Sequence, residues 1–367
     1  LPREAEPLEG DNEPDDTLTA GPDADAPTSF GAFAGRSRGG LFDVTRKTPI
    51  DSWAEKMGAV FEPVSLWRRA RYFPQTGEDM DAAVARECKA TRTSIGIQDA
   101  STLGKIEVVG PDAAEFLNRM YTNLWTKLGV GRCRYGLMLG EDGYIFDDGV
   151  VGRLAEDRFH VTTTTGGAPR VMATMEDFLQ TEWPDLDVWL TSITEQWSVI
   201  ALNGPNVRKL IAPFVEGIDL DKEAFPHMAI REGSIFGVPM RLFRVSFTGE
   251  LGFEVNVPSG YGHGVWQRLI DAGAGYDIVP YGTEAMHVLR AEKGYIIDGQ
   301  DTDGSDGWSW SGIGQDGSGQ NFAPAVEYPD DIALRDPPAG GVGRVKAHGL
   351  PPLYFALPAD AGGIHLS

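Results

Sequence analysis

Two segments of the chain resemble each other, and this internal similarity limits the possible folds more than any other feature of the sequence. Residues 105–120 (KIEVVGPDAAEFLNRM) and 197–214 (WSVIALNGPNVRKLIAPF) each contain an apolar run, a Gly-Pro pair and an amphipathic stretch. The runs before Gly110 and Gly204 have the composition of strands, and apolar residues recur at helical spacing after each Gly-Pro pair. The two segments lie too far apart for a solenoid repeat. We therefore predict two related strand-turn-helix units within one α+β domain.

The hydrophobic pattern predicts further elements on either side of these units. Met80, Val84 and Cys88 recur at helical spacing, which predicts a helix over 80–91 at the start of the compact domain. Further strands are predicted over 158–163, 240–246 and 253–257, and further helices over 169–179, 261–272 and 283–292.

Composition divides the chain into four parts. Residues 1–29 are acidic and poor in large apolar side chains, so we expect a disordered lead, and Leu1 in place of Met suggests that upstream sequence is missing. Residues 30–79 are aromatic and basic, which predicts a strap on a domain surface that links to such an upstream domain. Residues 80–303 form the predicted domain. Residues 304–367 hold 12 glycines and 7 prolines, which predicts an irregular tail.

The net charge of −22 excludes some classes of partner. Such a field repels nucleic acid and anionic membrane surfaces, and no apolar run approaches the roughly 18 residues that cross a bilayer. The two cysteines, Cys88 and Cys133, have no partner at metal-ligand spacing and do not make a disulfide framework. We therefore expect a cytoplasmic protein with reduced thiols, no metal site, no nucleic-acid partner and no membrane partner.

A predicted hairpin at 132–148 carries the first group of candidate functional residues. A turn at 141–143 joins two apolar runs, and Asp147 and Asp148 stand at the end of the second run. Neighbouring strand residues point to opposite faces, so only one of the two carboxylates can face the interior. Turn capping is the competing interpretation of this pair.

Two more segments place polar groups inside apolar runs. In SFTGELGFE (246–254), glycines permit close approach to a ligand, and Glu254 is either solvent-facing or an acceptor for a donor-rich heterocycle. Arg290 and Glu292 end a predicted helix, where they form either a site or a solvated end, and His287 is more typical of a packed or surface histidine. The glycines between 312 and 319 lack the strand and helix of a dinucleotide-binding motif.

At these motifs the chain resembles a known family. Residues 30–303 are similar to the carboxyl-terminal half of sarcosine oxidase alpha subunits, and through them to the folate-binding aminomethyltransferases, the T proteins of the glycine cleavage system. The resemblance rests on RKTPI (46–50), GEDMDAAVARECKATR (77–92), DASTLGKIEVVGPDAAEFLNRMYTN (99–123), GRCRYGLMLGEDGYIFDDGV (131–150), TEQW (194–197), SFTGELGFE (246–254) and HVLRAEKGYIIDGQDTDG (287–304).

The resemblance implies a tetrahydrofolate site. In that family, the equivalents of Tyr135, Asp148 and Glu254 line the pterin pocket, and Phe247 and Arg290 complete the set of cofactor-binding candidates here. One carboxylate can accept the ring N–H and the exocyclic amine of a pterin together. Asp148 is the candidate catalytic residue, because it would handle the proton as a folate nitrogen attacks the one-carbon unit. Phe247 replaces a frequent tyrosine, which favours the oxidase branch.

The implied function is that of the folate-binding part of a sarcosine oxidase-like complex. This part captures the one-carbon unit from oxidative N-demethylation of sarcosine as 5,10-methylenetetrahydrofolate, while flavin and NAD are expected only on missing parts or on partner subunits. A glycine cleavage-type aminomethyltransferase and a truncated, non-catalytic folate-binding or scaffold module are the alternatives. After residue 304 the resemblance ends, as a shifted reading frame would explain, so we expect the family's carboxyl-terminal β-barrel to be absent.

Overall fold

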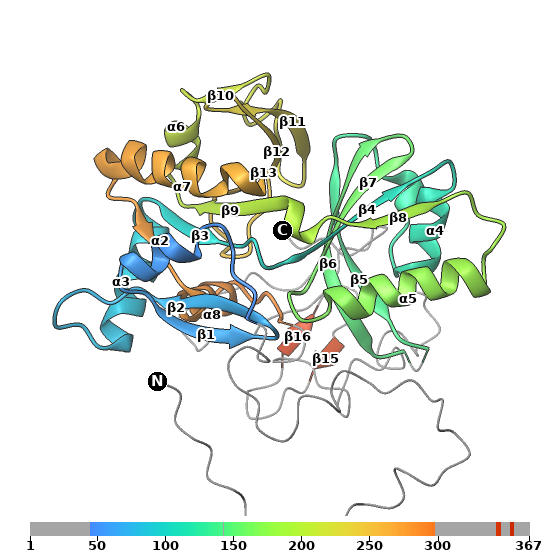
Figure 1. The fold of residues 1–367 in the computed structure, drawn as a ribbon, viewed down its shortest axis with the longest axis horizontal. Coiled ribbons are helices and arrows are strands. Elements are labelled where there is room, and N and C mark those ends of the chain that lie inside the picture. The colour runs from blue at the N-terminus through green and yellow to red at the C-terminus, as the bar shows by residue number, and fades with distance from the viewer. Residues whose placement is uncertain (1–44, 142, 298–342, 346–352, 356–367) are drawn as a thin grey trace, which may run out of the picture. The chain divides into compact units, whose positions relative to one another are not determined.

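The computed structural model describes residues 45–141 and 143–297 and two short strands at 343–345 and 353–355. The main sheets are a seven-stranded sheet, in the order β10-β11-β12-β13-β9-β3-β14, and a five-stranded sheet, in the order β5-β6-β7-β4-β8 (Figure 1). The strands of the larger sheet are β3 (Gly96–Asp99), β9 (Trp197–Asn203), β10 (Val215–Glu216), β11 (Ile230–Ile235), β12 (Val238–Phe243), β13 (Gly252–Pro258) and β14 (Val279–Pro280). Those of the smaller sheet are β4 (Gly104–Val109), β5 (Cys133–Leu139), β6 (Ile145–Ala155), β7 (Arg158–Thr163) and β8 (Trp189–Ser192).

Two helices cover one face of the five-stranded sheet, α4 (Ala113–Met120) and α5 (Ala168–Thr181), as Figure 1 shows. Phe116 and Leu117 of α4 and Val171 and Met175 of α5 are completely buried against this face. The strands contribute every second residue to the same core, for example Ile106 and Val108 of β4. The opposite face of this sheet is therefore left for the seven-stranded sheet.

One face of the seven-stranded sheet packs on the helix α7 (Ser259–Gly273). Its core side chains include Ile200 and Leu202 of β9, and Trp266 of α7 is buried among them. Helices α3 (Met80–Thr93) and α8 (Thr283–Ala291) pack against each other through a separate small cluster, which contains Leu289. The remaining helix of this part is the short α6 (Val207–Ile211).

Residues 45–79 belong to the core rather than to an extended strap. They form the helix α2 (Asp51–Lys56) and the hairpin β1 (Val60–Val64) and β2 (Trp67–Tyr72). Trp53 of α2 packs edge-on against Trp266, with ring centroids 5.1 Å apart, and Phe73 joins the same cluster. The sequence pattern predicts a boundary at residue 80, because helical spacing of apolar residues begins there. Burial of these aromatic side chains instead ties the segment to α7.

The structure confirms the two related strand-turn-helix units and places one in each main sheet. The first is β4 followed by α4, and the second is β9 followed by α6. Gly110 and Gly204 both have positive φ, at 142° and 130°. A Cβ atom on Gly204 would lie 2.2 Å from the carbonyl oxygen of Ser94, so no other residue fits this turn without movement of the backbone.

Gly204→Ala is expected to destabilise the protein by roughly 2–3 kcal/mol, because strain at positive φ adds to a clash with backbone. Gly237→Ala is a matched control. Gly237 also has positive φ, but no atom lies within 4 Å of the position that a Cβ would take there, so about 1 kcal/mol is expected. Urea unfolding of both variants checks this, and equal losses would contradict the role of the close approach.

Most elements begin and end near the predicted positions. The strand at 158–163 is β7, and the predicted helices over 80–91, 169–179, 261–272 and 283–292 correspond to α3, α5, α7 and α8. The exception is the Asp147-Asp148 pair, which lies near the start of the 11-residue strand β6 and not at a strand end. Gly149 lies in the interior of this strand. A Cβ atom at position 149 would lie 1.9 Å from the carbonyl oxygen of Thr162, so glycine is the residue that fits there. An Asp-Asp-Gly sequence is thus compatible with a strand interior here.

The described residues do not include the acidic lead, the part of the predicted strap before residue 45 or most of the predicted tail. The region after residue 304, where the family's carboxyl-terminal β-barrel is expected to be absent, lies largely outside them as well. Within 343–355 the structure describes an antiparallel pair, β15 (Gly343–Val345) and β16 (Leu353–Phe355). In the ranges that the structure describes, no helix is both long and apolar enough to cross a membrane.

Candidate functional site

Tyr135 and Asp148 lie on neighbouring strands and contact each other. The hydroxyl of Tyr135 donates a hydrogen bond to Oδ2 of Asp148 at 2.5 Å. Tyr135 is opposite Val150 in the ladder between β5 and β6, and Asp148 is opposite Leu137. Directly opposed residues of antiparallel strands share a face of the sheet. Both half-buried side chains therefore lie on the same face as Val150.

This face of the five-stranded sheet packs on the seven-stranded sheet. Val150 packs against a small apolar cluster that contains Phe243 of β12 and Val245, two residues after that strand. A Cβ on Gly152, two residues further along β6, would lie 3.1 Å from the ring of Phe243. The Tyr135–Asp148 pair therefore faces the space between the two sheets.

Asp147 points to the opposite face, where the helices pack. It is 2% exposed, and its carboxylate accepts hydrogen bonds from the backbone N–H of Thr164 at 3.0 Å and from the hydroxyl of Thr164 at 2.8 Å. These bonds hold the turn between β7 and α5. Turn capping, the competing interpretation of the aspartate pair, thus describes Asp147, while the Asp148 side chain faces the inter-sheet space.

Glu254 faces the same space from the other sheet. It lies opposite Phe243 of β12 and opposite Ala201 of β9, so these three side chains share one face of the seven-stranded sheet. Phe243 packs towards the five-stranded sheet, since its ring lies 5.2 Å from that of His160 on β7. The strand registers therefore place Asp148 and Glu254 on the two sheet faces that pack against each other, although the residues are distant in sequence.

The environment of Glu254 disfavours its charged form. Among the described residues, none donates a hydrogen bond to the partly exposed carboxylate of Glu254. Burial raises the pKa of Glu254 to about 7, and the positive charge of Lys105 offsets this only in part. A carboxylate of this kind has free acceptor capacity for a ligand with two adjacent N–H groups.

Lys105, which supplies the nearby positive charge, is completely buried on β4. Its ammonium group donates to the carbonyls of Ser101 at 2.9 Å and Leu103 at 2.7 Å. Burial lowers the pKa of Lys105 to about 8, while Asp99 and Glu254 act in the opposite direction. The sequence pattern did not single out this residue. The sequence feature that could have identified it is the presence of Lys105 and Glu107, two positions apart, in an otherwise apolar strand.

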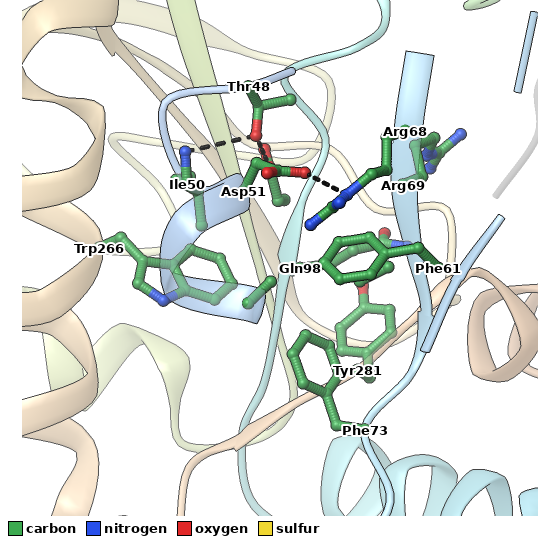
Figure 2. A pocket seen from close by; sticks show the side chains of 13 residues that line it. Thr48, Ile50, Asp51, Phe61, Arg68, Arg69, Phe73, Gln98, Trp266 and Tyr281 are labelled. Atoms are coloured by element: carbon green, nitrogen blue, oxygen red, sulfur yellow. Dashed lines mark hydrogen bonds and ion pairs between the residues drawn. The ribbon is translucent and has the colours of Figure 1, made fainter. Parts of the chain in front are cut away.

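A small cavity lies between α2, the β1–β2 hairpin and the end of β3, and Figure 2 shows its lining. Its volume is about 20 Å³, which is enough for one water molecule and too little for a pterin. Gln98 lines it and is 6% exposed, and the side-chain nitrogen of Gln98 has no hydrogen-bond partner among the described residues. An ordered water would satisfy this donor.

A larger pocket, of about 600 Å³, lies on the other side of the five-stranded sheet. It opens between α4, α5 and the turn of the β5–β6 hairpin and is lined by apolar side chains that include Met138, Phe146, Phe178 and Trp183. Asp148 and Glu254 do not line it. This pocket is therefore a second candidate ligand site, and its mainly apolar lining differs from the carboxylates that face the space between the sheets.

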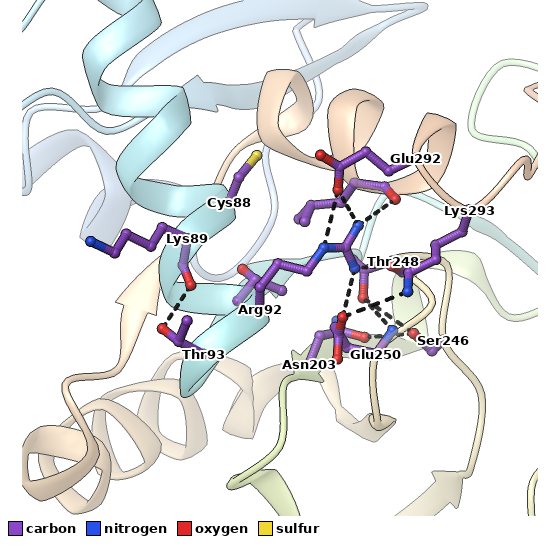
Figure 3. A network of polar contacts seen from close by, with 12 residues as sticks. Cys88, Lys89, Arg92, Thr93, Asn203, Ser246, Thr248, Glu250, Glu292 and Lys293 are labelled. Atoms are coloured by element: carbon purple, nitrogen blue, oxygen red, sulfur yellow. Dashed lines mark hydrogen bonds and ion pairs between the residues drawn. The ribbon is translucent and has the colours of Figure 1, made fainter. Parts of the chain in front are cut away.

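The loop of residues 246–251 is fixed to the end of α8 by one arginine, as Figure 3 shows. Arg92 at the end of α3 donates to Glu250 at 2.9 Å, to Glu292 at 2.6 Å and to the carbonyl of Thr248 at 2.6 Å. A fourth bond reaches the carbonyl of Leu289 at 2.9 Å. The segment 246–254 and the end of the helix that carries Glu292 are thus brought together at this arginine.

Phe247 and Arg290 both contact Tyr295 beside this network. The rings of Phe247 and Tyr295 stack with centroids 6.1 Å apart, and Arg290 donates to the carbonyl of Tyr295 at 2.9 Å. Arg290 is 9% exposed and does not form the solvated helix end that was the competing interpretation. The candidate residues therefore fall into two groups, Tyr135, Asp148 and Glu254 between the sheets and Phe247 and Arg290 at the end of α8.

Arg92→Lys is expected to destabilise the protein by about 1–3 kcal/mol, because a lysine cannot reproduce the planar fork of donors that reaches four acceptors. Arg119→Lys is the matched control. Arg119 makes an exposed pair with Glu115 on α4, so a change of at most about 0.5 kcal/mol is expected. Thermal unfolding at equal ionic strength separates the two, and a similar loss for both would mean that the network does not anchor the loop.

The comparison with known families decides the affiliation. The model of the family described as "GCVT N-terminal domain" matches residues 50–314, which is most of the chain. The chain belongs to the GCVT N-terminal domain family. The match begins at Ile50, directly before α2, and ends ten residues beyond 304, where the resemblance was expected to stop.

Within this family, the chain is similar to sarcosine oxidase alpha subunits and to aminomethyltransferases. Sarcosine oxidase subunit alpha of Corynebacterium sp. (strain P-1) is 56% identical over 280 residues, which are 76% of this chain and 29% of that subunit. The aminomethyltransferase of Chlorobium phaeovibrioides (strain DSM 265 / 1930) is 30% identical over 258 residues, which are 70% of this chain and 67% of that protein. The chain spans less than a third of the length of the alpha subunits that it matches.

A solved structure supports the same affiliation. The glycine cleavage system aminomethyltransferase T of Bartonella henselae matches 70% of this chain and 64% of its own length, with a TM-score of 0.60 and 28% identity. The family's α+β fold is therefore the fold of this chain. In the described parts of the chain, no group of three or more histidine, cysteine, aspartate or glutamate side chains could hold a metal ion.

Proposed function

We propose that this chain is the tetrahydrofolate-binding region of a sarcosine oxidase-type protein. In this role it captures the one-carbon unit released by oxidative N-demethylation of sarcosine as 5,10-methylenetetrahydrofolate. The similarity to sarcosine oxidase alpha subunits, at 56% identity, supports this branch over the aminomethyltransferases, at about 30%. Phe247, in place of the tyrosine that is frequent in the aminomethyltransferase motif, supports the same choice.

The Glu254 carboxylate is the observation that carries the proposal. It is partly exposed, faces the space between the sheets and receives no hydrogen bond from any described residue. A pterin offers an N–H and an amine side by side, and a carboxylate accepts both in a charge-assisted pair. The residues present therefore fit the group that the family implies.

Asp148 and Tyr135 act on the opposite side of the same space. Bound tetrahydrofolate supplies the nucleophilic nitrogen atoms that take up the one-carbon unit. Asp148 would receive the proton that such a nitrogen loses when its bond to carbon forms. The hydrogen bond from the Tyr135 hydroxyl holds Oδ2 of Asp148 in place and so fixes the orientation of the carboxylate.

Oxidation of the amine belongs to other parts of the proposed assembly. Flavin and NAD would be carried by regions outside this chain or by other subunits, and these subunits are the proposed partners. The chain spans only 29% of the Corynebacterium alpha subunit, so there is room in such a protein for the oxidising centre.

Isothermal titration calorimetry with tetrahydrofolate, under reducing and oxygen-free conditions, tests the proposal on the purified chain. We expect binding with one site per chain and a Kd of about 1–100 μM, the range for a ligand of this size held by a few charged hydrogen bonds. Absence of binding at millimolar tetrahydrofolate would reject the proposal.

A further inference from the structure

A second group of polar residues, separate from the proposed folate site, lies around the ring of Phe253. Phe253 neighbours Glu254 on β13 but points to the opposite face of the sheet, where it joins the core beneath α7. The guanidinium carbon of Arg208 on α6 lies 5.4 Å from the centre of the Phe253 ring, and that of Arg244, just after β12, lies 5.3 Å from it. Two guanidinium groups thus converge on one aromatic side chain.

Both arginines hold buried N–H groups without an acceptor. Among the described residues, Nη1 of Arg208 and Nε of Arg244 have no hydrogen-bond partner. Arg244 makes one side-chain bond, from Nη1 to the carbonyl of Gly252 at 3.1 Å. A buried donor without an acceptor is costly, and the cost is larger for a charged group. An oxygen atom of a water molecule or of a bound anion would satisfy such a donor.

The surroundings of the pair are positively charged. In the described ranges, no carboxylate forms an ion pair with Arg208 or Arg244, although the chain as a whole has a net charge of −22. Burial lowers the pKa of Arg244 to about 10, and repulsion from Arg208 adds to this effect. The neighbouring His227 also has a lowered pKa, because of burial and then of the charges of Arg244 and Arg132. An anion placed here would relieve this repulsion.

We propose that Arg208 and Arg244 form a binding site for an oxyanion, either a phosphate group or a carboxylate. Guanidinium groups bind such oxygens through charge-assisted N–H bonds, and each of the two arginines holds one unpartnered donor. Both side chains are partly exposed while their unpartnered N–H groups are buried, so an anion that enters from solvent would reach these donors through a shift of the guanidinium groups. This site lies on the other face of β13 from Glu254, and the inference does not depend on the proposed function.

The test measures thermal unfolding of the full chain in inorganic phosphate, in glutarate and in sodium chloride at the same ionic strength. With phosphate or glutarate at about 10 mM, we expect the Tm of the wild type to rise by roughly 2–4 °C above that in chloride. A larger shift with phosphate identifies a phosphate site, and a larger shift with glutarate identifies a carboxylate site.

Arg208→Gln is expected to weaken binding of the anion about tenfold or more and to remove the shift, because half of the charged donors are lost. Lys209→Gln is the matched control, since it removes one positive charge from the next position of the same helix. It should retain the full shift. Equal loss in both variants, or no shift in the wild type with either anion, would overturn the site.

A second measurement avoids dependence on the variants. In the wild-type chain, NMR titration of the His227 ring should give a higher pKa in phosphate than in chloride, because a bound anion offsets the charge of Arg244. An unchanged pKa of His227 in saturating phosphate would also contradict the proposal.

Discussion

Glu254→Gln is expected to weaken binding of tetrahydrofolate about 30-fold or more at pH 8, because an amide can accept only one of the two pterin N–H groups and carries no charge. The effect corresponds to roughly 2–4 kcal/mol, the cost of a lost charge-assisted pair. Calorimetric titration of both proteins measures it. Binding within a factor of three of the wild type would remove Glu254 from the site.

The pH dependence of binding gives an independent check on the same residue. The pKa of Glu254 is about 7 in the free protein, and bound N–H donors favour the charged form. The affinity of the wild type should therefore rise with pH up to about 7 and then level off. The affinity of Glu254→Gln should stay flat through this range.

The same substitution should have the opposite effect on the stability of the ligand-free protein. The folded-state pKa of Glu254 is about 7, above its ordinary value of 4.5, so between these values the unfolded chain loses a proton that the folded protein keeps. The wild type therefore loses stability as pH rises from about 4.5 to 7, by up to about 3 kcal/mol from this group. Glu254→Gln should be the more stable protein at pH 8, with little difference at pH 4. Glu176→Gln, an exposed position on α5, should change neither stability nor binding.

Asp148→Asn is expected to reduce capture of a one-carbon unit at least 100-fold while tetrahydrofolate binding stays within about threefold of the wild type. An asparagine can still accept the Tyr135 hydrogen bond, but it cannot take up a proton. The measurement is the rate at which the chain with bound tetrahydrofolate captures formaldehyde, after subtraction of the uncatalysed rate. An unchanged rate would show that Asp148 does not handle the proton.

Asp147→Asn is the internal control for that experiment. Its carboxylate accepts two hydrogen bonds from Thr164, and an asparagine would direct an N–H group at one of these donors. We expect a loss of about 1–3 kcal/mol in stability, with folate binding and capture rate unchanged once the protein is folded. Equal kinetic effects from the two aspartates would contradict the division of roles between them.

Local patterns in the sequence were sufficient to predict most of the elements. The turn glycines Gly110 and Gly204 and the apolar periodicity after them located both repeated units, since these features act within a few residues of chain. Strand alternation also predicted that Asp147 and Asp148 face opposite sides. Spacing alone thus predicts which neighbouring residues point to opposite faces, but not which face is covered by helices.

Features that depend on packing between distant segments could not be predicted in this way. From the sequence alone, Trp53 is predicted to lie in a surface strap. Its contact with Trp266, more than 200 positions later in the chain, is evident only from the structure. Lys105 is a lysine within a strand pattern, and only the structure shows that backbone carbonyls hold its ammonium group in the interior. The convergence of Arg92, Glu250 and Glu292 likewise depends on tertiary structure, because the three residues come from separate elements.

The central claim is that tetrahydrofolate binds between the two sheets, with its pterin on Glu254. A crystal structure of the chain with tetrahydrofolate tests this most directly. We predict carboxylate oxygens of Glu254 within hydrogen-bond distance, about 2.7–3.2 Å, of the pterin ring N–H and the exocyclic amine, with Asp148 facing the ligand from β6. A pterin bound instead in the pocket beside Phe178 and Trp183, with Glu254 uncontacted, would contradict the claim.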